Sequence, residues 1–500
     1  MADILFTHSY FLHFDAKEFK AMMPYPPLGT LYAASAVRQH GYSVELFDSM
    51  LAHHEDEILQ AIQIHRPKLV VIYDDDFNYL SKMCLSRMRI AAFRIASIAK
   101  KAGAIVIAHG SDSADHLEDY LTHDIDFILF GEAEQSLKEI VGHLLKNNRP
   151  LDSIPGVAYI QNGIARRTAK RDVVQDLDML PFPAWDLVDT DKYKKIWLRR
   201  HGYYSLNMVT TRGCPFRCNW CAKPIYGRTY NSRSPANVVQ EMKFLKTTVK
   251  PDHLWFCDDI FGLKPGWIDE FCCEVRRQDA AIPFKCLMRV DLLLRDGLVS
   301  RLRDAGCTTV WVGAESGSQK VLDAMDKGIT VQQIHEAAQQ LKMAGIRVGF
   351  FIQFGYPGEM QEDIDLTLTM LRHCKPDEIG ISVAYPLPGT RFYDDVRQRM
   401  GDKHNWSDSQ DLDLMFPGTF TPDFYRALHK VTHKQFRIWQ GIDLLKRLIR
   451  RPLQARHTDL RQMAAMAYHV ATLPLYSCRL RTLAKGTSTK KAEVRSKAAA

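Results

Sequence analysis

Short apolar runs alternate with amphipathic segments through the first 147 residues. Runs of apolar and β-branched residues predict buried strands, and apolar residues three or four positions apart predict helices. The predicted strands are Ile4–Thr7, Val44–Phe47, Leu69–Tyr73, Ile105–Ala108 and Phe127–Phe130. The predicted helices cover residues 29–40, 55–65, 85–102 and 133–145. Strands that alternate with helices predict an α/β fold with a doubly wound parallel (Rossmann-like) sheet, which binds ligands at the carboxyl ends of its strands.

A second alternating series follows a proline-broken connector at residues 148–205. Its predicted strands are Leu206–Thr211, His253–Cys257, Phe284–Met288, Thr309–Val312, Val348–Phe354 and Ile379–Ala384. Six strand–helix units in succession predict a partial (β/α)6 barrel over residues 206–398, with its active site at the carboxyl ends of the strands.

The pattern changes again after the barrel. Residues 399–485 predict a helical C-terminal region, with helices over 421–485. The small and polar residues of 486–500 predict a disordered tail.

Composition narrows the class of protein. Five hundred residues are too many for one core, and an apolar fraction of 46% with 25% charged residues is typical of a soluble globular protein. The first residues do not resemble a signal peptide, and no apolar run reaches the roughly 18 residues of a membrane span. Eleven cysteines in such a chain indicate a reducing compartment, so we expect a cytoplasmic protein.

The net charge of +8 is partly concentrated near the C-terminus, in Lys446, Arg447, Arg450 and Arg451. A basic face can bind nucleic acid, an anionic membrane or an acidic redox partner. The simpler interpretation is a solvated surface, so we expect no stable nucleic-acid or membrane partner.

The most informative motif is a C-x3-C-x2-C run formed by Cys214, Cys218 and Cys221, directly after the first predicted barrel strand. Thiolates are the usual protein ligands of iron–sulfur clusters. Three of them can hold three irons of a [4Fe–4S] cubane and leave the fourth open to the amino and carboxylate groups of S-adenosyl-L-methionine (SAM). A zinc site, the alternative, usually takes four ligands. The motif therefore predicts an oxygen-sensitive radical SAM cluster.

The chain resembles the radical SAM superfamily, and more narrowly its cobalamin-binding subfamily, over roughly residues 1–395. The segments that carry this resemblance follow predicted barrel strands. They are Cys221–Arg228 with Ser234-Pro235, Asp258–Phe261, Gly313–Ser318, Gly355–Glu359 and Pro386–Thr390.

The resemblance implies residues that bind SAM. Asp258 and Asp259 lie where the family's second-strand motif approaches the methionine ammonium, although one of them could instead cap the next turn. Glu315 and Ser316 occupy the segment that meets the ribose or carboxylate, or else satisfy their own loop.

The same resemblance places Gly355 beside the adenine, with Tyr385 and Pro386 closing that pocket. Arg289, at the end of the third strand, could bind the SAM carboxylate or substrate, or form a structural salt bridge. Trp220 is expected to pack near the adenine or the cluster.

The N-terminal domain resembles the subfamily's cobalamin-binding module. The residues implied to contact cobalamin are Gly110, Ser111, Asp112, Gly131 and Glu132. The Asp-x-His-x-x-Gly motif that supplies a cobalt-ligating histidine elsewhere is absent, so cobalamin would bind with its own base displaced and no histidine on cobalt. Asp74-Asp75-Asp76 could order a loop or bind a cation, but we expect solvated side chains. A vestigial domain that only shields the barrel is the alternative.

Together these resemblances imply a cobalamin-dependent radical SAM methyltransferase that acts on an unactivated carbon or phosphinate centre of a small molecule. A flavodoxin or ferredoxin reductant is implied by the cluster. A cyclase or rearrangement enzyme of the same subfamily stays open, as does a non-catalytic cobalamin- or SAM-binding protein. A methylthiolating enzyme is disfavoured because it would carry a second cysteine triad before the barrel, where this chain has only Cys84.

Overall fold

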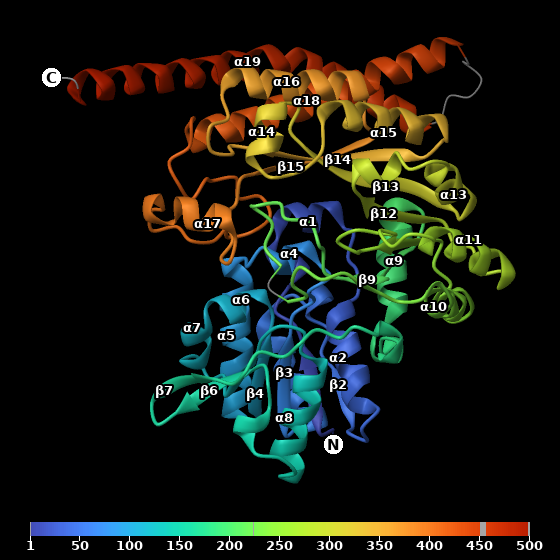
Figure 1. Ribbon diagram of the computed structural model, residues 1–500, viewed down its shortest axis with the longest axis vertical. Helices are drawn as coiled ribbons and strands as arrows, with labels where there is room; N and C mark the ends of the chain where they lie inside the picture. The colour runs from blue at the N-terminus through green and yellow to red at the C-terminus, as the bar shows by residue number, and fades with distance from the viewer. Residues whose placement is uncertain (1, 224, 451–456, 499–500) are drawn as a thin grey trace.

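The computed structural model describes residues 2–223, 225–450 and 457–498. It consists of an N-terminal α/β domain, a second α/β domain stacked on it, and two long helices at the far end (Figure 1). The prediction of two parallel-sheet domains followed by helices is therefore confirmed.

The N-terminal sheet has five parallel strands in the order β2-β1-β3-β4-β5. Helices α2 (Leu28–Arg38) and α8 (Glu134–Lys146) pack on one face, and α3 (Ile58–His65) and α5 (Ser86–Lys101) on the other. Alternate residues of each strand feed the two cores, because successive side chains of a strand point to opposite faces. The strands are β1 (Ile4–Thr7), β2 (Val44–Leu46), β3 (Leu69–Tyr73), β4 (Ile105–His109) and β5 (Phe127–Leu129).

The predicted connector contributes more structure than its prolines indicate. Its strands β6 (Val157–Gln161) and β7 (Ile164–Arg167) extend the sheet antiparallel to β5. Val157, Ala158 and Tyr159 of β6 are buried, so they cover an edge that β5 would otherwise leave unpaired. The connector then forms α9 (Thr190–His201).

The second sheet contains six parallel strands whose spatial order follows their order in the chain. This order is that of an open (β/α)6 barrel, and the prediction of a partial barrel is confirmed. The strands are β8 (Ser205–Met208), β11 (His253–Phe256), β12 (Phe284–Met288), β13 (Cys307–Glu315), β14 (Arg347–Phe354) and β15 (Glu378–Val383). The main covering helices are α10 (Pro235–Thr248), α11 (Trp267–Arg277), α13 (Leu298–Asp304), α15 (Val331–Met343) and α16 (Gln361–Cys374).

The carboxyl ends of the two sheets contact one another. Lys82, in the loop region after β3, forms an ion pair with Asp259 after β11, with Nζ 2.6 Å from Oδ1. The hydroxyl of Tyr385, after β15, donates to the carbonyl of Met83 at 2.8 Å. The loops at the carboxyl ends of both sheets, where folds of these two kinds bind ligands, therefore line one interface.

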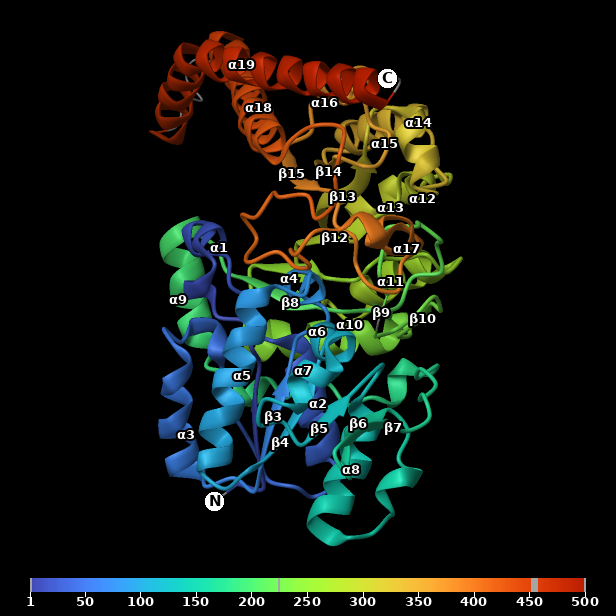
Figure 2. The same cartoon turned by 90° about the vertical axis from the view of Figure 1, so that its left-hand side faces the viewer.

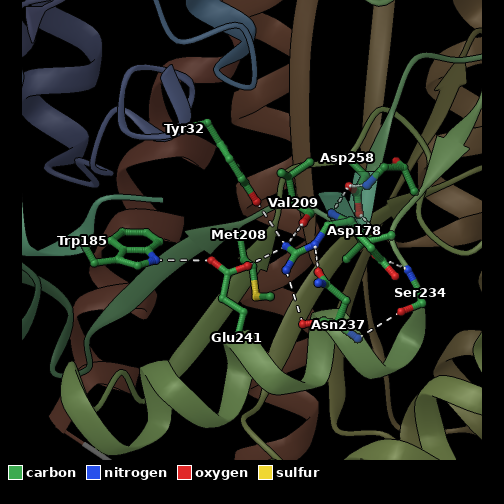
Figure 3. A network of polar contacts seen from close by, with 12 residues as sticks. Tyr32, Asp178, Trp185, Met208, Val209, Ser234, Asn237, Glu241 and Asp258 are labelled. Carbon is green, nitrogen blue, oxygen red and sulfur yellow. Dashed lines mark hydrogen bonds and ion pairs between the residues drawn. The ribbon is translucent and has the colours of Figure 1, made fainter. Parts of the chain in front are cut away.

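Two buried arginines join the domains. Arg233 donates to Glu241 Oε2 of α10 at 2.5 Å, to the Val209 carbonyl at 2.9 Å and to the Tyr32 hydroxyl of α2 at 3.2 Å. Figure 3 shows this network, with Trp185 also donating to Glu241. One guanidinium thus binds a helix from each domain.

Arg212 makes the second junction, immediately before the cysteine loop. Its guanidinium pairs with Glu132 and, at 2.6 Å, with Glu134, both of which follow β5. All three side chains are buried, and the guanidinium also lies 5.2–5.6 Å from the ring centroids of Tyr32, Phe77 and Tyr226. A cation so enclosed is stabilised by its two anions and by the aromatic faces.

The segment after the barrel returns to the N-terminal domain. After α17 (Arg391–Val396), Asn405 donates to the Cys84 carbonyl and accepts from Arg89, both at 2.9 Å. The hydroxyl of Ser409 donates to Asp15 Oδ1 at 2.7 Å. The chain then turns outward into α18 (Pro422–Arg450) and α19 (His457–Ala498).

The predicted disordered tail differs from the structure, which describes the backbone of 486–498 as the last part of α19. Lys, Ala, Glu and Arg are strong helix formers, and extending an existing helix requires no new nucleus. Residues 499–500 lie outside the described residues. Among the helices of the described ranges, none combines the length and the hydropathy that a membrane crossing requires.

Replacing Arg212 by Met should destabilise the protein by about 3–5 kcal/mol, because it leaves two buried carboxylates without their cation. Arg38→Met is the matched control, since Arg38 pairs with Asp186 at an exposed site and should cost about 1 kcal/mol or less. Denaturant unfolding measures both effects. Adding Glu132→Gln and Glu134→Gln to Arg212→Met should recover part of the lost free energy of unfolding. If Arg212→Met and Arg38→Met lower that free energy equally, this account of the buried cluster is wrong.

Candidate functional site

The three cysteines of the motif lie on one loop between β9 (Thr211–Arg212) and β10 (Asn231–Ser232), which pair antiparallel at its base. Gly213 begins the loop with a φ of 80°, and a Cβ there would lie 2.3 Å from the Thr229 carbonyl oxygen. Only glycine fits this turn, which lets the two ends of the loop approach closely.

All three cysteines are free thiols. Cys214 is buried and Cys218 and Cys221 are half-buried. Burial raises the pKa of Cys214, and burial together with Asp259 raises the pKa of Cys221 to about 12, while Lys223 opposes both shifts. Cys214 and Cys218 also raise the pKa of Cys221, so the three thiols lie within electrostatic reach of one another.

The three thiols are not grouped around a single point in this structure. Within the described ranges, no three His, Cys, Asp or Glu side chains are grouped so that they could hold one ion. An iron–sulfur cubane does not require that convergence, because each thiolate binds a different iron. Metal binding would also remove the thiol protons that burial retains.

Asn219 and Phe216 of the loop contact the barrel. The Asn219 side chain donates to the Ala324 carbonyl at 2.7 Å and accepts from the Tyr356 hydroxyl at 2.8 Å. The guanidinium of Arg289 lies 3.7 Å from the ring centroid of Phe216.

Arg289 also pairs with Asp291 through Nε at 3.0 Å and Nη2 at 3.1 Å, and donates to the carbonyls of Lys327 and Gly328. Of the two roles left open for it, the structure therefore shows the structural salt bridge.

The two aspartates after β11 have different partners. Asp258 is buried and accepts three hydrogen bonds, from the backbone and hydroxyl of Thr210 and the backbone of Thr211, at 2.6–2.8 Å. Its carboxylate orders the chain leading into the cysteine loop, although burial raises its pKa to about 6. Asp259 instead pairs with Lys82 of the N-terminal domain and lies near the thiols. Of the two, Asp259 is the one positioned beside the loop.

Glu315 and Ser316 are buried at the end of β13. Glu315 has a φ of 56° and its carboxylate lies 2.8 Å from Lys327 Nζ. The hydroxyl of Ser316 lies 3.1 Å from Thr367 Oγ1 and accepts from the backbone of Ser318. Both side chains satisfy groups of their own surroundings in this structure.

Gly355, Tyr385 and Pro386 are buried around the ends of β14 and β15. The backbone N–H of Gly355 donates to Glu359 Oε2 at 2.6 Å, and burial raises the pKa of Glu359 to about 8. The ring of Tyr385 packs on Trp406, with centroids 4.2 Å apart. The segment after the barrel thus covers this side of the site.

Three buried side-chain atoms near the barrel's strand ends have no hydrogen-bond partner among the described residues, which the sequence alone could not predict. Trp220 Nε1 on the cysteine loop, Gln353 Oε1 at the end of β14, and Glu359 Oε1 are buried without a hydrogen-bond partner in the described chain. Buried polar atoms are nearly always paired. These three atoms mark the carboxyl end of the barrel as a place where a polar ligand would complete the hydrogen bonding.

The three aspartates after β3 are buried, so the expectation of solvated side chains was wrong. Asp74 accepts from the backbone and hydroxyl of Ser9, both at 2.8 Å. Asp75 accepts from three backbone N–H groups, those of Leu28, Gly29 and Phe77. These two carboxylates therefore order the loops at the carboxyl ends of β1 and β3, including the start of α2.

Asp76 has no such partner. Neither of its oxygens forms a hydrogen bond, and Oδ2 lies 3.4 Å from Nδ1 of the buried His109. The ring of His109 stacks on Tyr73 at 4.0 Å and its Nε2 lies 3.0 Å from the Gly131 carbonyl. Burial raises the pKa of Asp76 well above its usual value and lowers that of His109 to about 4, so burial favours the uncharged form of both groups. The hydroxyl of Ser111 is likewise buried and unpartnered.

The other residues expected to contact cobalamin divide into two groups. Gly110 and Gly131 are turns with φ of 153° and 72°; a Cβ on Gly110 would lie 3.0 Å from Asp74, and one on Gly131 would face the Ile225 carbonyl of the cysteine loop at 4.0 Å. Asp112 is held by Arg89 at 2.6 and 2.7 Å.

Glu132 is held by Arg212 and by the backbone of Val174. The predicted carboxylates are thus bound by the protein, and Ser111 is the predicted polar side chain that remains available. Asp76 and His109 lie at the ends of the neighbouring strands β3 and β4. These residues stand out because buried polar atoms on them lack hydrogen-bond partners in the described part of the chain, a property that cannot be predicted from the sequence.

Comparison with known proteins agrees with this geometry. Residues 208–371 match the model of the Radical SAM superfamily. An uncharacterized methyltransferase of Pyrococcus horikoshii is 28% identical over 74% of this chain and 78% of its own. An anaerobic magnesium-protoporphyrin IX monomethyl ester cyclase of Rubrivivax gelatinosus is 26% identical over 79% of this chain and 69% of its own.

Among solved structures, the cobalamin-dependent SAM radical enzyme OxsB, with aqua-cobalamin and SAM bound, aligns with 95% of this chain and 72% of its own. Its TM-score is 0.70 at 17% sequence identity, which shows a shared fold. Residues 208–371 of this chain therefore match the radical SAM family model, and 95% of the chain shares the fold of OxsB.

Proposed function

We propose that this protein is a cobalamin-dependent radical SAM enzyme that transfers a methyl group to an unactivated carbon or phosphinate centre of a small molecule. The observation that carries the proposal is the meeting of the two sheets at their carboxyl ends, with buried, unpartnered polar atoms on both sides. One side carries the cysteine loop, and the other carries Asp76, His109 and Ser111.

On the barrel side, Cys214, Cys218 and Cys221 would hold a [4Fe–4S] cluster. When bound, the cluster with SAM supplies a 5′-deoxyadenosyl radical that abstracts a hydrogen atom from the substrate. The residues that we assign to SAM are Asp259, Trp220, Gln353 and Glu359, because they lie by the loop or have unpaired polar atoms at the strand ends. Glu315, Ser316, Gly355, Tyr385 and Pro386 shape that pocket rather than offering free polar side chains.

On the N-terminal side, Asp76 and Ser111 would meet cobalamin, which when bound carries the methyl group. Both have buried side-chain oxygens without a hydrogen-bond partner in the described ranges, which suits the amides at the edge of a corrin ring. His109 contacts the Gly131 carbonyl and faces Asp76, and we assign it no role as a cobalt ligand. Lys82 and Arg212 link this side to the cysteine loop and set the spacing of the two cofactors.

A second candidate is a cyclase of the same subfamily, favoured by the similarity to the Rubrivivax cyclase. The two reactions differ in their products. Methyl transfer from SAM leaves S-adenosylhomocysteine, whereas cyclisation without methylation leaves only methionine and 5′-deoxyadenosine. The cluster also needs an electron donor, and we propose a flavodoxin or ferredoxin in the cytoplasm.

Cys218→Ala should lose nearly all cluster iron and labile sulfide after anaerobic reconstitution, since one of three cluster ligands is missing. Cys273→Ala is the matched control, because Cys273 is an exposed free thiol outside the loop. Iron and sulfide assays with absorbance spectra measure the outcome. Equal iron and sulfide content in the two variants would show that the cysteine loop does not hold the cluster.

Asp76→Ala should weaken cobalamin binding by about three- to tenfold, the usual value of one hydrogen bond. Asp76→Asn should bind nearly as well as the unchanged protein, because burial favours the uncharged form of Asp76 and the amide keeps an oxygen in the side chain. Equilibrium dialysis against hydroxocobalamin gives the dissociation constants. Asp56→Ala, at an exposed carboxylate, is the control and should leave the dissociation constant unchanged. If Asp76→Asn binds cobalamin as weakly as Asp76→Ala, the contact depends on the charge of Asp76 and the proposed uncharged contact is wrong.

Product analysis separates the candidate reactions. The reconstituted protein, with SAM and a reductant, should form 5′-deoxyadenosine and, only when cobalamin is bound, S-adenosylhomocysteine. Chromatography with mass detection measures both. If 5′-deoxyadenosine forms without S-adenosylhomocysteine, the result favours the cyclase. If the protein binds SAM and cobalamin but assembles no cluster, it is a binding protein and not an enzyme of this kind.

A further inference from the structure

The outer side of the C-terminal helix pair carries apolar side chains that the described chain leaves uncovered. Figures 1 and 2 show α18 and α19 side by side at the end of the molecule opposite the N-terminal domain. They run antiparallel, since Arg447 pairs with Asp459 and Lys434 binds Thr472. A Cβ on Gly441 would lie 2.5 Å from Met466 Sδ, so the inner face of α19 packs closely on α18.

The opposite face of α19 points away from α18. Residues 462–478 contain no charged residue, and exposed side chains recur there every three or four positions, the spacing of one helix face. They are Leu460, Ala464, Ala467, Ala471, Leu475 and Cys478. Leu460 is 69% exposed and Leu475 is 73% exposed. Ile442, Leu445 and Ile449 form a similar exposed stripe on α18.

Basic side chains flank this apolar surface at both ends. Arg461 lies at one end of the uncharged run, near Lys446 and Arg450 of α18, and Arg479 and Arg481 lie at the other. In residues 457–485 the sequence contains one acidic residue, Asp459, which is buried and pairs with Arg447. An apolar stripe with tyrosines nearby and basic residues at its ends is the pattern of a helix that lies in a membrane interface.

We propose that the outer face of α19 binds an anionic membrane surface, with this helix along the plane of the bilayer. The exposed leucine side chains of α19 would enter the headgroup–acyl boundary, and the arginines at the ends of the uncharged run would pair with lipid phosphates. The inference rests on the helices alone and is independent of the proposed reaction. It departs from the sequence-based expectation of a merely solvated basic surface, because exposed basic residues lie at both ends of an exposed, uncharged part of α19.

A second copy of the chain fits this surface less well. A two-fold axis with antiparallel α19 helices centred on residue 470 sets Arg461 opposite Arg479 of the other copy. A two-fold axis with parallel helices sets each arginine opposite itself. Both arrangements bring like charges together without an acidic partner, which disfavours association, whereas anionic lipid complements the same charges.

The test is vesicle flotation of the full chain, reconstituted with its cofactors. Vesicles of equal parts phosphatidylglycerol and phosphatidylcholine should carry the protein to the top of the gradient, and pure phosphatidylcholine vesicles should carry far less. Binding should fall as salt screens the basic side chains. Leu460→Glu with Leu475→Glu should lower the partition coefficient at least about tenfold, and Arg479→Glu with Arg481→Glu should remove the preference for phosphatidylglycerol.

The matched control is Ile64→Glu with Met179→Glu, which makes the same change at exposed apolar positions elsewhere and should leave binding unchanged. Circular dichroism melts check that each variant folds. Failure to bind phosphatidylglycerol vesicles, or equal binding by the leucine and control variants, would overturn the proposal. A concentration-dependent dimer that the leucine substitutions abolish, without vesicle binding, would assign the surface to a second copy.

Discussion

A buried arginine stands between the cysteine loop and the strand ends of the N-terminal domain. Arg212 ends a short strand, and the cysteine loop starts at the next residue, so the direction of that loop depends on where the guanidinium is held. Its two carboxylate partners follow β5 of the other domain, and three aromatic rings surround it. The geometry of one ion cluster therefore sets the position of the thiols relative to the N-terminal strand ends. Because removing charges from water is expensive, this cluster is stable only when both domains are folded and in contact.

The same requirement explains why so many acidic residues at the interface bind protein rather than ligand. Asp258 holds the backbone before the loop, Asp74 and Asp75 hold the loops after β1 and β3, and Glu132 binds Arg212. These carboxylates stiffen the two facing edges. The atoms left unpaired, on Asp76, Ser111 and Gln353, lie between them and are the natural contacts of a ligand.

The strands of both sheets could be predicted because each is a short apolar run between helical patterns, as in Leu69–Tyr73 and Phe284–Met288. The cysteine loop could be predicted from spacing alone. The edge strand β6 could not, because its assignment depends on pairing with β5 rather than on a local signal. Nor could the pairing of Lys82 with Asp259, or the unsatisfied oxygens of Asp76, since these arise from contacts between residues far apart in the chain. Motif resemblance located the loops correctly, but it could not distinguish a carboxylate that faces a ligand from one that binds a neighbouring backbone.

The return of the segment around Asn405 and Ser409 to the N-terminal domain has a consequence for assembly. This segment is synthesised after both sheets, yet it bridges them, and Trp406 packs on Tyr385 at the edge of the interface. A nascent chain therefore passes through a stage in which both sheets exist and this strap is still absent. At that stage the interface between the two sheets is open on the side that this strap later covers, so the strap closes it last.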